Sequence, residues 1–256
     1  MNQLLQDKVI VVSGGTKGVG KGVILESAKQ GANVVIGGRD EKSANEVLKQ
    51  VCEMGKQGIF VYTDLRDIKD CEKLFDGAYN RFGKVDGFFS YAGVTHAASL
   101  EDLDDDNYSI IFAVNVRAAL FCCKSAVKYM KMNPNGGSIV LNGSPHAWGG
   151  EQDRVAYACS KGALLTLTEH IAQHYAEFGI RSNYITMGWT PTEGELELRR
   201  TQNMSVEELH KLAASMIPAG RMTEISDLVP GVIYLLSDYS KMVAGSNLRI
   251  TGGWYI

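Results

Sequence analysis

Apolar runs and helical patterns alternate along the whole chain. The apolar runs are short and mostly continuous, which is typical of strands covered on both faces of a sheet, and they occupy residues 9–12, 33–36, 59–62, 87–89, 138–141, 181–186 and 247–250. Apolar residues recur with helical spacing in residues 23–30, 44–53, 71–82, 110–130, 155–178 and 227–236. This alternation predicts an α/β fold of three layers, with a parallel sheet between two layers of helices.

The same pattern predicts one domain. The chain has no Pro- or Ser-rich linker, repeat or low-complexity tract, and 256 residues that are 45% hydrophobic suffice for a full core. We therefore expect a single domain over residues 1–256. Residues 191–215 break the rhythm, because they are polar and charged between a strand and the next predicted helix. Such a segment is typical of a functional lid, which we place around residues 190–215.

Composition excludes several classes of function. The net charge is −3 and the basic residues are scattered, so no basic stripe favours nucleic acid. The first residues, MNQLLQDK, lack the features of a secretion signal, and no apolar segment is expected to span a bilayer, so we expect a soluble cytoplasmic protein without a membrane partner. The five cysteines show no C-x-x-C spacing, and we expect reduced, mostly structural thiols.

A glycine-rich stretch, SGGTKGVGKG (residues 13–22), follows the first apolar run. A P-loop requires G-x-x-x-x-G-K-[ST], but Gly22 stands where a hydroxyl must bind Mg²⁺, so this interpretation is weak. The stretch also contains G-x-x-x-G-x-G, formed by Gly14, Gly18 and Gly20, between a strand and a helix. Glycines placed there let backbone N–H groups and a helix N-terminus approach a pyrophosphate. A plain tight turn stays open at this point.

Arg39 indicates which dinucleotide such a site would prefer. It ends the second predicted strand, where an acidic residue would bind the ribose 2′-hydroxyl of NAD and an arginine accommodates the 2′-phosphate of NADP. No carboxylate precedes Arg39, and Lys17 in the glycine loop adds a second cation. We therefore predict NADP(H), with NAD(H) as the less favoured cofactor. The alternative is that Asp40 and Glu41 begin a helix and Arg39 pairs with them.

The second half of the chain carries candidate chemistry. Tyr157 and Lys161 lie one helical turn apart on the same face. A nearby ammonium favours the phenolate, so we expect Lys161 to lower the pKa of Tyr157 and make it a usable proton donor and acceptor. Ser144 lies just past a predicted strand, at an end that faces ligands in α/β sheets. The three residues together are typical of a catalytic set.

With these motifs in this order, the chain resembles the short-chain dehydrogenase/reductase family over nearly all of its length. The family's T-G-x-x-x-G-x-G corresponds to Ser13-Gly14 through Gly20, and its I-R-v-N stretch to residues 179–183. Its aspartate after the third strand, its asparagine in the fourth helix, its serine and its Tyr-x-x-x-Lys correspond to Asp64, Asn115, Ser144, Tyr157 and Lys161. Three motifs depart from the family pattern, at Tyr91, Met187 and Thr251, and none of them removes a catalytic group.

The resemblance implies a Rossmann-type, doubly wound parallel sheet and a ketone–alcohol oxidoreductase. It implies that Tyr157 is the general acid/base, that Lys161 lowers its pKa and binds the nicotinamide ribose, and that Ser144 holds the substrate oxygen. Asn115 would keep a water that links Lys161 to solvent. The cofactor-binding residues that it implies are Gly14, Thr16, Lys17, Gly18, Val19, Gly20, Arg39, Asp64, Leu65, Ala92, Gly93, Tyr157, Lys161, Gly188, Thr190 and Thr192.

The substrate is predicted from the residues that flank these positions. We place His146, Trp148 and Trp189 in the substrate pocket. Together with Met187 and the lid residues Met204 and Met216, they favour a large, partly apolar ketone such as a steroid, bile acid or polyketide. A 3-ketoacyl thioester and a sugar or polyol stay open as substrates. The family forms dimers and tetramers, and the apolar end at residues 254–256 suits burial against a neighbouring subunit.

Two metal-like patterns are interpreted as structural. His170 and His174 have the spacing of a zinc helix, but the H-E-x-x-H glutamate and a third ligand are missing. Asp102, Asp104 and Asp106 resemble the start of a calcium loop but fit better the favourable end of a helix. No metal is expected. A non-catalytic dinucleotide sensor and a P-loop NTPase remain as alternative functions.

Overall fold

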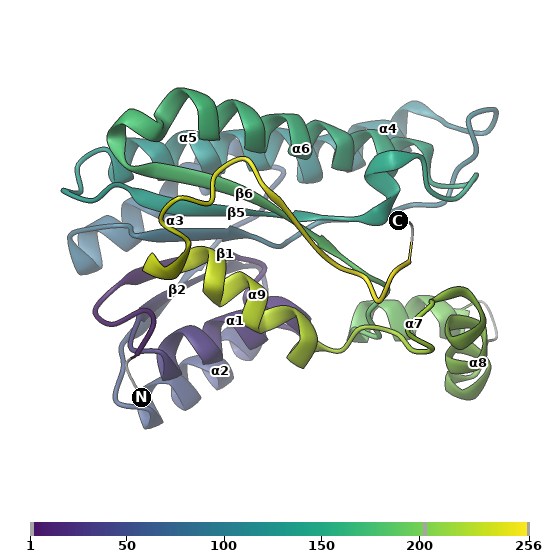
Figure 1. Ribbon diagram of the computed structural model, residues 1–256, viewed down its shortest axis with the longest axis horizontal. Helices are drawn as coiled ribbons and strands as arrows, with labels where there is room; N and C mark the ends of the chain where they lie inside the picture. Colours follow the sequence, from purple (N-terminus) through teal and green to yellow (C-terminus); the bar gives the residue numbers. More distant parts are fainter. Residues whose placement is uncertain (1–2, 202–203, 255–256) are drawn as a thin grey trace.

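The structure is a computed structural model, which describes residues 3–201 and 204–254 (Figure 1). Within these residues one seven-stranded sheet forms, with the order β3-β2-β1-β4-β5-β6-β7. All of its pairings are parallel. The strands are β1 Val9–Ser13, β2 Asn33–Gly38, β3 Gly58–Tyr62, β4 Gly87–Ser90, β5 Gly137–Gly143, β6 Ile180–Met187 and β7 Asn247–Ile250. The predicted strands are confirmed, and most extend by one or two residues.

Helices cover both faces of the sheet (Figure 1). One layer contains α1 (Gly18–Lys29), α2 (Glu41–Glu53) and α9 (Ile225–Leu236), and the other contains α3 (Ile68–Phe82), α5 (Ala118–Met130) and α6 (Val155–Tyr175). Successive residues of β1 alternate between the two cores: Ile10 and Val12 pack under α1 and α9, whereas Val9 and Val11 pack under α3 and α5. The predicted three-layer, doubly wound fold is confirmed.

Two helical predictions need correction. The pattern over residues 110–130 is interrupted, because α4 (Asp105–Phe112) and α5 are joined by a π-helical turn, Ala113–Arg117. The first helix begins at Gly18 rather than residue 23, because the glycine loop itself forms its first turn. Apolar periodicity detects neither feature, because the π-helical turn still carries valines and the first turn of α1 contains two glycines.

The segment expected to be a lid contains two helices, α7 (Glu193–Thr201) and α8 (Val206–Met216), which lie to one side of the sheet (Figure 1). Residues 202–203 of this segment lie outside the described residues. Leu209 and Ala213 of α8 are buried in a small cluster with Trp254, against which Met204 packs, while Met216 is exposed. Movement of this segment as a lid stays a prediction.

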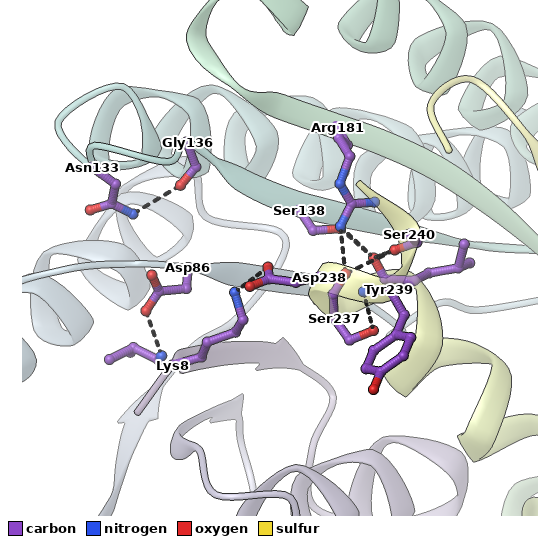
Figure 2. Close-up of polar contacts among 12 residues, drawn as sticks. Lys8, Asp86, Asn133, Gly136, Ser138, Arg181, Ser237, Asp238, Tyr239 and Ser240 are labelled. Carbon is purple, nitrogen blue, oxygen red and sulfur yellow. Dashed lines mark hydrogen bonds and ion pairs between the residues drawn. The ribbon is translucent and has the colours of Figure 1, made fainter. Parts of the chain in front are cut away.

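A network of polar side chains lies at the end of the sheet where the strands begin (Figure 2). Arg181 at the start of β6 donates from Nη2 to the backbone oxygens of Leu235 (3.0 Å) and Ser237 (3.1 Å). Ser138 Oγ donates to the same Leu235 oxygen at 2.7 Å. These donors satisfy carbonyls at the C-terminal end of α9, which would otherwise lack partners. The arginine in the I-R-v-N stretch thus has a structural role here.

One helical stretch contradicts the expectation that no segment could span a bilayer. Residues Asp105–Met130 form a helical stretch of 26 residues, which contains an 18-residue window with a mean hydropathy of 1.7, as a membrane span would. A buried core helix has the same properties, and α5 contributes Ala119, Cys122, Ala126 and Met130 to the core beneath it. Because 44% of the apolar window is buried, packing within the fold accounts for part of its apolar composition.

Candidate active site

The candidate residues meet at the carboxyl ends of the strands, where ligands bind in open α/β sheets. Two adjoining cavities of about 750 Å³ and 560 Å³ run over the glycine loop, and we call them together the glycine-loop cleft. A third cavity of about 660 Å³ adjoins the cleft at Tyr157 and Asn142, and we call it the Tyr157 cavity. The order of strands reverses between β1 and β4, which places the cleft at the switch point of the sheet.

The glycine loop makes a close turn that side chains would prevent. Gly14 has φ +84°, and a Cβ there would lie 2.9 Å from the Cβ of Ala92. A Cβ on Gly20 would lie 2.1 Å from the backbone oxygen of Gly14. Gly14, Thr16, Lys17 and Gly18 line the cleft, and α1 begins at Gly18. The loop therefore presents backbone and a helix N-terminus to the cleft, as a pyrophosphate site requires.

The two predicted cations lie at the same end of the cleft. Arg39 is exposed and lines the cleft together with Lys17. Asp40 caps α2 by accepting the N–H of Ser43 at 3.0 Å, and its ion pair is with Lys17, at 3.6 Å. Asp40 therefore begins helix α2, which agrees with one part of the alternative interpretation, that Asp40 and Glu41 start a helix. Arg39, in contrast, is directed to the cleft rather than paired with Asp40.

Asp64 and Leu65 also line the cleft, next to Arg66. The guanidinium of Arg66 hydrogen-bonds the Asp64 carboxylate, with Nε at 3.0 Å from Oδ1, and lowers the pKa of Asp64 to about 2. Asp64 is thus a charged acceptor at any physiological pH. Arg66 was not singled out in the sequence, because nothing in its local pattern distinguishes it from a surface arginine.

Ser144, Tyr157, Lys161 and Asn115 come together where the cleft meets the Tyr157 cavity. Tyr157 and Lys161 are presented by the first turns of α6, and Lys161 Nζ donates to the backbone oxygen of Asn142 at 2.8 Å. Ser144 follows β5 directly and is buried. Asn115 lies in the π-helical turn, where its side chain bonds the backbone N–H of Val94 (2.8 Å) and Ser160 Oγ (3.0 Å). Their catalytic roles stay predictions.

Burial dominates the electrostatics of this set. It raises the pKa of Tyr157 to about 12, although a hydrogen bond with Ser144 opposes the shift, and it lowers the pKa of Lys161 to about 8. The expectation that Lys161 lowers the pKa of Tyr157 is therefore wrong for this arrangement. The reason is that the ammonium is directed at the Asn142 carbonyl, 5.5 Å from the centroid of the Tyr157 ring, and is itself destabilised by desolvation.

The burial of Lys161 predicts a pH-dependent free energy of unfolding. Because the pKa falls from 10.5 in the unfolded chain to about 8 in the folded one, the unfolded chain holds more protons between these values, and stability rises with pH there. The rise should amount to about 3 kcal/mol. Below pH 8 the cost of burying the charge is fully present, and above pH 10.5 it is gone. In Lys161→Met, which cannot titrate, this rise should vanish.

Urea unfolding across this pH range measures the effect. Lys49→Met, which removes an exposed lysine of α2, is the matched control and should keep the rise of the wild type. An equally steep rise in Lys161→Met would show that Lys161 is not responsible.

Tyr184 fixes the position of Ser144. Its ring is fully buried in β6, and its hydroxyl accepts the N–H of Ser144 (3.2 Å) while donating to the backbone oxygen of Lys161 (3.1 Å). Gly143 lies against the face of this ring, where a Cβ would come within 1.9 Å of Cε1. Tyr184 and Gly143 were not identified from the sequence, because their contacts join β5, β6 and α6.

The Tyr157 cavity combines aromatic rings with charged side chains. Trp189 and Trp254 stack with ring centroids 5.9 Å apart, and Glu195 accepts from Trp189 Nε1 (2.6 Å) and Arg199 Nε (2.7 Å). Val19, His146, Met187, Gly188, Thr190 and Thr192 also line this cavity. Glu195, Arg199 and Trp254 were missed in the sequence, since they come from the lid segment and the chain end.

Two expectations about this cavity are not met. Trp148 is 47% exposed, packs edge-on against Tyr184 and lies under the Arg249 guanidinium, so the structure does not bring it into the Tyr157 cavity. The short 3₁₀ turn Pro145–Trp148 directs it away. Met204 and Met216 are likewise absent from the described lining of the cavity. Of the proposed apolar end, Tyr255 and Ile256 lie outside the described residues.

The two metal-like patterns make other contacts in the described residues. His170 and His174 contact each other, with centroids 4.5 Å apart, and Asp104 caps α4 by accepting the N–H of Asn107 at 2.7 Å. No group of three metal-ligating side chains occurs within residues 3–201 and 204–254. The five cysteines are free thiols, three of them buried.

The cleft fits a nicotinamide dinucleotide. Asn142 Oδ1 is buried at the junction of the two cavities, and no described atom hydrogen-bonds it, which leaves an acceptor for a ligand amide. Lys161 uses one of its protons on Asn142, so others are available to hydroxyl groups. The glycine loop lines the cleft with backbone, and the two cations Arg39 and Lys17 lie at the same end of it.

Known proteins resemble this chain over its whole length. A family model described as enoyl-(acyl carrier protein) reductase matches residues 14–255. L-rhamnose 1-dehydrogenase (NAD(P)(+)) from Azotobacter vinelandii is 32% identical, over 99% of this chain and 98% of that protein. A 3beta-hydroxysteroid dehydrogenase from Mediterraneibacter gnavus is 29% identical, over 97% and 95%. The crystal structure of a putative short-chain alcohol dehydrogenase from Sinorhizobium meliloti superposes with a TM-score of 0.91 at 25% identity, covering 99% and 98%.

Proposed function

Because this chain belongs to the short-chain dehydrogenase/reductase family and is an oxidoreductase, we propose that it interconverts a ketone and a secondary alcohol with NADP(H). The observation that carries the proposal is the meeting of Ser144, Tyr157 and Lys161 at the junction of the glycine-loop cleft and the Tyr157 cavity. A cofactor in the cleft and a substrate in the cavity would meet at these side chains.

A bound nicotinamide would supply or accept the hydride at the carbonyl carbon. Tyr157 gives a proton to the substrate oxygen in reduction and takes it back in oxidation. Ser144 hydrogen-bonds the same oxygen, where negative charge develops, and Tyr184 keeps Ser144 in place. Lys161 donates hydrogen bonds to hydroxyl groups of the cofactor and is held in place by the backbone oxygen of Asn142.

The lining of the Tyr157 cavity supports a substrate with an apolar ring face and polar groups at its edge. The stacked Trp189 and Trp254 offer the flat apolar surface that a steroid, bile acid or polyketide-like ketone needs. A sugar or polyol is the second candidate, favoured by the Glu195–Arg199 ion pair, which offers hydrogen bonds to hydroxyl groups. We also propose a cytoplasmic homodimer or homotetramer, which a sedimentation mass equal to the monomer would contradict.

The choice of NADP(H) predicts a change of preference in Arg39→Asp. Loss of a charge-assisted bond to the 2′-phosphate should weaken NADPH binding by about 10- to 100-fold and NADH binding much less. Calorimetric titration with both cofactors measures this. Lys42→Asp makes the same charge change on the exposed surface of α2, so it controls for the effect of net charge on cofactor binding. An unchanged ratio of affinities in Arg39→Asp would mean that Arg39 does not bind the phosphate.

One set of measurements separates this proposal from the alternatives. The wild type is titrated with NADPH, NADH and ATP, and nicotinamide oxidation is followed with steroid, sugar-derived and acyl-thioester ketones. We expect NADPH binding and turnover of at least one class. Binding of NADPH without turnover of any ketone would favour a dinucleotide sensor. Binding of ATP alone, dependent on Mg²⁺ and Lys21, would favour a P-loop NTPase.

A further inference from the structure

Arg154 is the one buried arginine among the described residues, and it lies in the wall of the Tyr157 cavity. It is 8% exposed and directly precedes α6, three residues before Tyr157. Its backbone is fixed there, because its N–H donates to the backbone oxygen of Glu151 (3.1 Å) and its own oxygen accepts the N–H of Ala158 (2.8 Å). Burial raises the pKa of Tyr157, and the charge of Arg154 lies near enough to oppose this rise. The fold therefore holds a cation beside the proposed general acid/base.

Much of this guanidinium has no partner within the described residues. Nη1 donates to the backbone oxygen of Asp153 at 3.0 Å and to its carboxylate at 2.8 Å. No described atom accepts from Nε or Nη2, so the protons of these two nitrogens are unused. Neither nitrogen is sealed inside the protein, so both reach open space. Because the side chain is only 10% exposed, we assign that space to the cavity that Arg154 lines.

Arg181 shows how the same fold satisfies an arginine with a structural role. It is half-buried, and its Nη2 donates to the backbone oxygens of Leu235 (3.0 Å) and Ser237 (3.1 Å), while Nη1 donates to that of Val243 (3.3 Å) (Figure 2). A guanidinium that is buried without acceptors destabilises a fold. Arg154 is more deeply buried than Arg181 and has fewer acceptors. This arrangement is expected of a group whose acceptor is a bound ligand.

The cavity that Arg154 lines assigns this ligand to the substrate side of the site. Arg154 lines the Tyr157 cavity and is absent from the described lining of both cavities of the glycine-loop cleft. In the proposed function the cofactor occupies the cleft and the substrate occupies the Tyr157 cavity. An acceptor for Nε and Nη2 of Arg154 is therefore a group of the substrate rather than of the cofactor.

The charges around the cavity favour an acceptor with a single negative charge. The other charged side chains in its described lining are Glu151, Glu195 and Arg199. Glu195 accepts from Trp189 and Arg199, and Glu151 is 39% exposed, and neither forms an ion pair with Arg154. These two carboxylates would repel a doubly charged phosphate. A carboxylate carries one charge, and its two oxygens match the parallel N–H groups of Nε and Nη2.

The same edge of a guanidinium binds a carboxylate elsewhere in this chain. Arg66 uses its Nε and Nη2 to hold Asp64, with Nε 3.0 Å from Oδ1. We propose that Arg154 binds a carboxylate of the substrate in this way, so that the enzyme acts on a ketone or alcohol that also bears a carboxylate. This inference rests on the proposed function and narrows its substrate class. A bile acid or a sugar acid carries such a group, whereas an unmodified steroid or a polyol does not.

Matched pairs of substrates test the charge directly. Levulinate, its next longer homologue and a cyclohexanone carboxylate are each compared with the methyl ester, which keeps the ketone and removes the charge. We expect kcat/KM of the wild type to be higher for the best acid than for its ester by about tenfold or more. Equal values for the acid and the ester in every pair would overturn the proposal.

Two substitutions of Arg154 separate substrate binding from support of the fold. In Arg154→Gln the KM of the acid should rise about 10- to 100-fold, because the charge-assisted bonds are lost, while kcat changes little. The ester does not use the charge, so its turnover should match that of the wild type and shows that the variant has folded. Arg154→Lys keeps the charge without the parallel donors, so its loss should be intermediate. An equal loss for acid and ester in both variants would overturn the proposal.

Two further variants serve as controls. Asp153→Asn removes the carboxylate that binds Nη1 but keeps the guanidinium. Arg81→Gln removes an exposed arginine near the end of α3, which lines none of the three cavities of the site. Both controls should prefer the acid as strongly as the wild type does. A preference that falls in Arg81→Gln as much as in Arg154→Gln would show that overall charge selects the acid, and the proposal would fail.

Calorimetry with molecules that cannot react separates this proposal from the proposed function. Cyclohexanecarboxylate and cyclohexanecarboxamide are titrated into the wild type and Arg154→Gln, with and without NADP⁺. We expect the carboxylate to bind the wild type more tightly than the amide by about tenfold or more, and the two to bind Arg154→Gln alike. If this holds and no ketone or alcohol is turned over, the carboxylate site stands and the proposed function fails. If the two molecules bind the wild type alike, the proposal fails whatever the enzyme turns over.

Discussion

Tyr157→Phe should lower kcat about 10³-fold for reduction and oxidation alike, while the affinity for NADPH changes little. The substitution removes one hydroxyl and leaves the ring, whose contacts with His146 and Lys161 are made by its face and edge. The substitution removes the Tyr157 hydroxyl, which is the group that passes a proton to the substrate oxygen in the proposed mechanism.

Stopped-flow and steady-state assays of Tyr157→Phe with the turned-over ketone measure this effect, and fluorescence titration measures NADPH binding. Tyr175→Phe is the matched control, because Tyr175 ends the same helix and packs on Phe178 far from the cleft. We expect it to keep the wild-type kcat. Retention of more than a tenth of the activity in Tyr157→Phe would remove Tyr157 from the role of general acid/base.

Gly143→Ala should destabilise the fold by about 3 kcal/mol or more, since a buried ring must be displaced to make room. The added Cβ would lie 1.9 Å from Cε1 and 2.2 Å from Cζ of Tyr184, and Tyr184 is fully buried. The clash between the new Cβ and the Tyr184 ring is relieved only if β5 and β6 separate or the ring rotates. Either change breaks the hydrogen bond from Ser144 N to the Tyr184 hydroxyl, so the remaining folded protein should also lose activity.

Thermal unfolding measures the loss as a fall in Tm of about 6–12 °C for a chain of this size. Gly162→Ala is the matched control, because a Cβ at this helical position meets only the backbone oxygen of Ala147, at 3.8 Å. Alanine there should be neutral or slightly stabilising. A Tm of Gly143→Ala within a degree of the wild type would show that the Tyr184 ring can move without cost.

The sequence predicted the sheet well because buried strands have a local signature. Each strand of a doubly covered parallel sheet is a run of apolar residues, and the runs ending at Val12, Ile36 and Phe89 could be located without any tertiary contact. The glycine loop and the Tyr157–Lys161 spacing were equally local, since both depend on neighbours within two helical turns. Helix α7 was missed because polar and charged residues dominate its sequence. Helix α8 has apolar residues at helical spacing, at Val206, Leu209, Ala213 and Met216, and was missed because the whole segment was interpreted as a lid.

The electrostatics of the site could not be predicted from the sequence. Spacing placed Lys161 one turn from Tyr157 and suggested that it would lower the pKa of the phenol. Burial, which spacing does not reveal, raises that pKa and lowers the pKa of Lys161. Trp148 was misplaced for a similar reason, because its distance in sequence from Ser144 does not tell on which side of a 3₁₀ turn it lies.

The sequence by itself determined the succession of strands and helices along the chain, the glycine loop, the family resemblance and the choice of Ser144, Tyr157 and Lys161 as catalytic candidates. These features are encoded in periodicity and short motifs, which act over a few residues. Only the tertiary structure decided that Trp189, Glu195, Arg199 and Trp254 line one cavity, and that the Tyr184 hydroxyl accepts the N–H of Ser144. Such contacts join segments far apart in the chain, and their energies depend on burial, which exists only once the chain has folded.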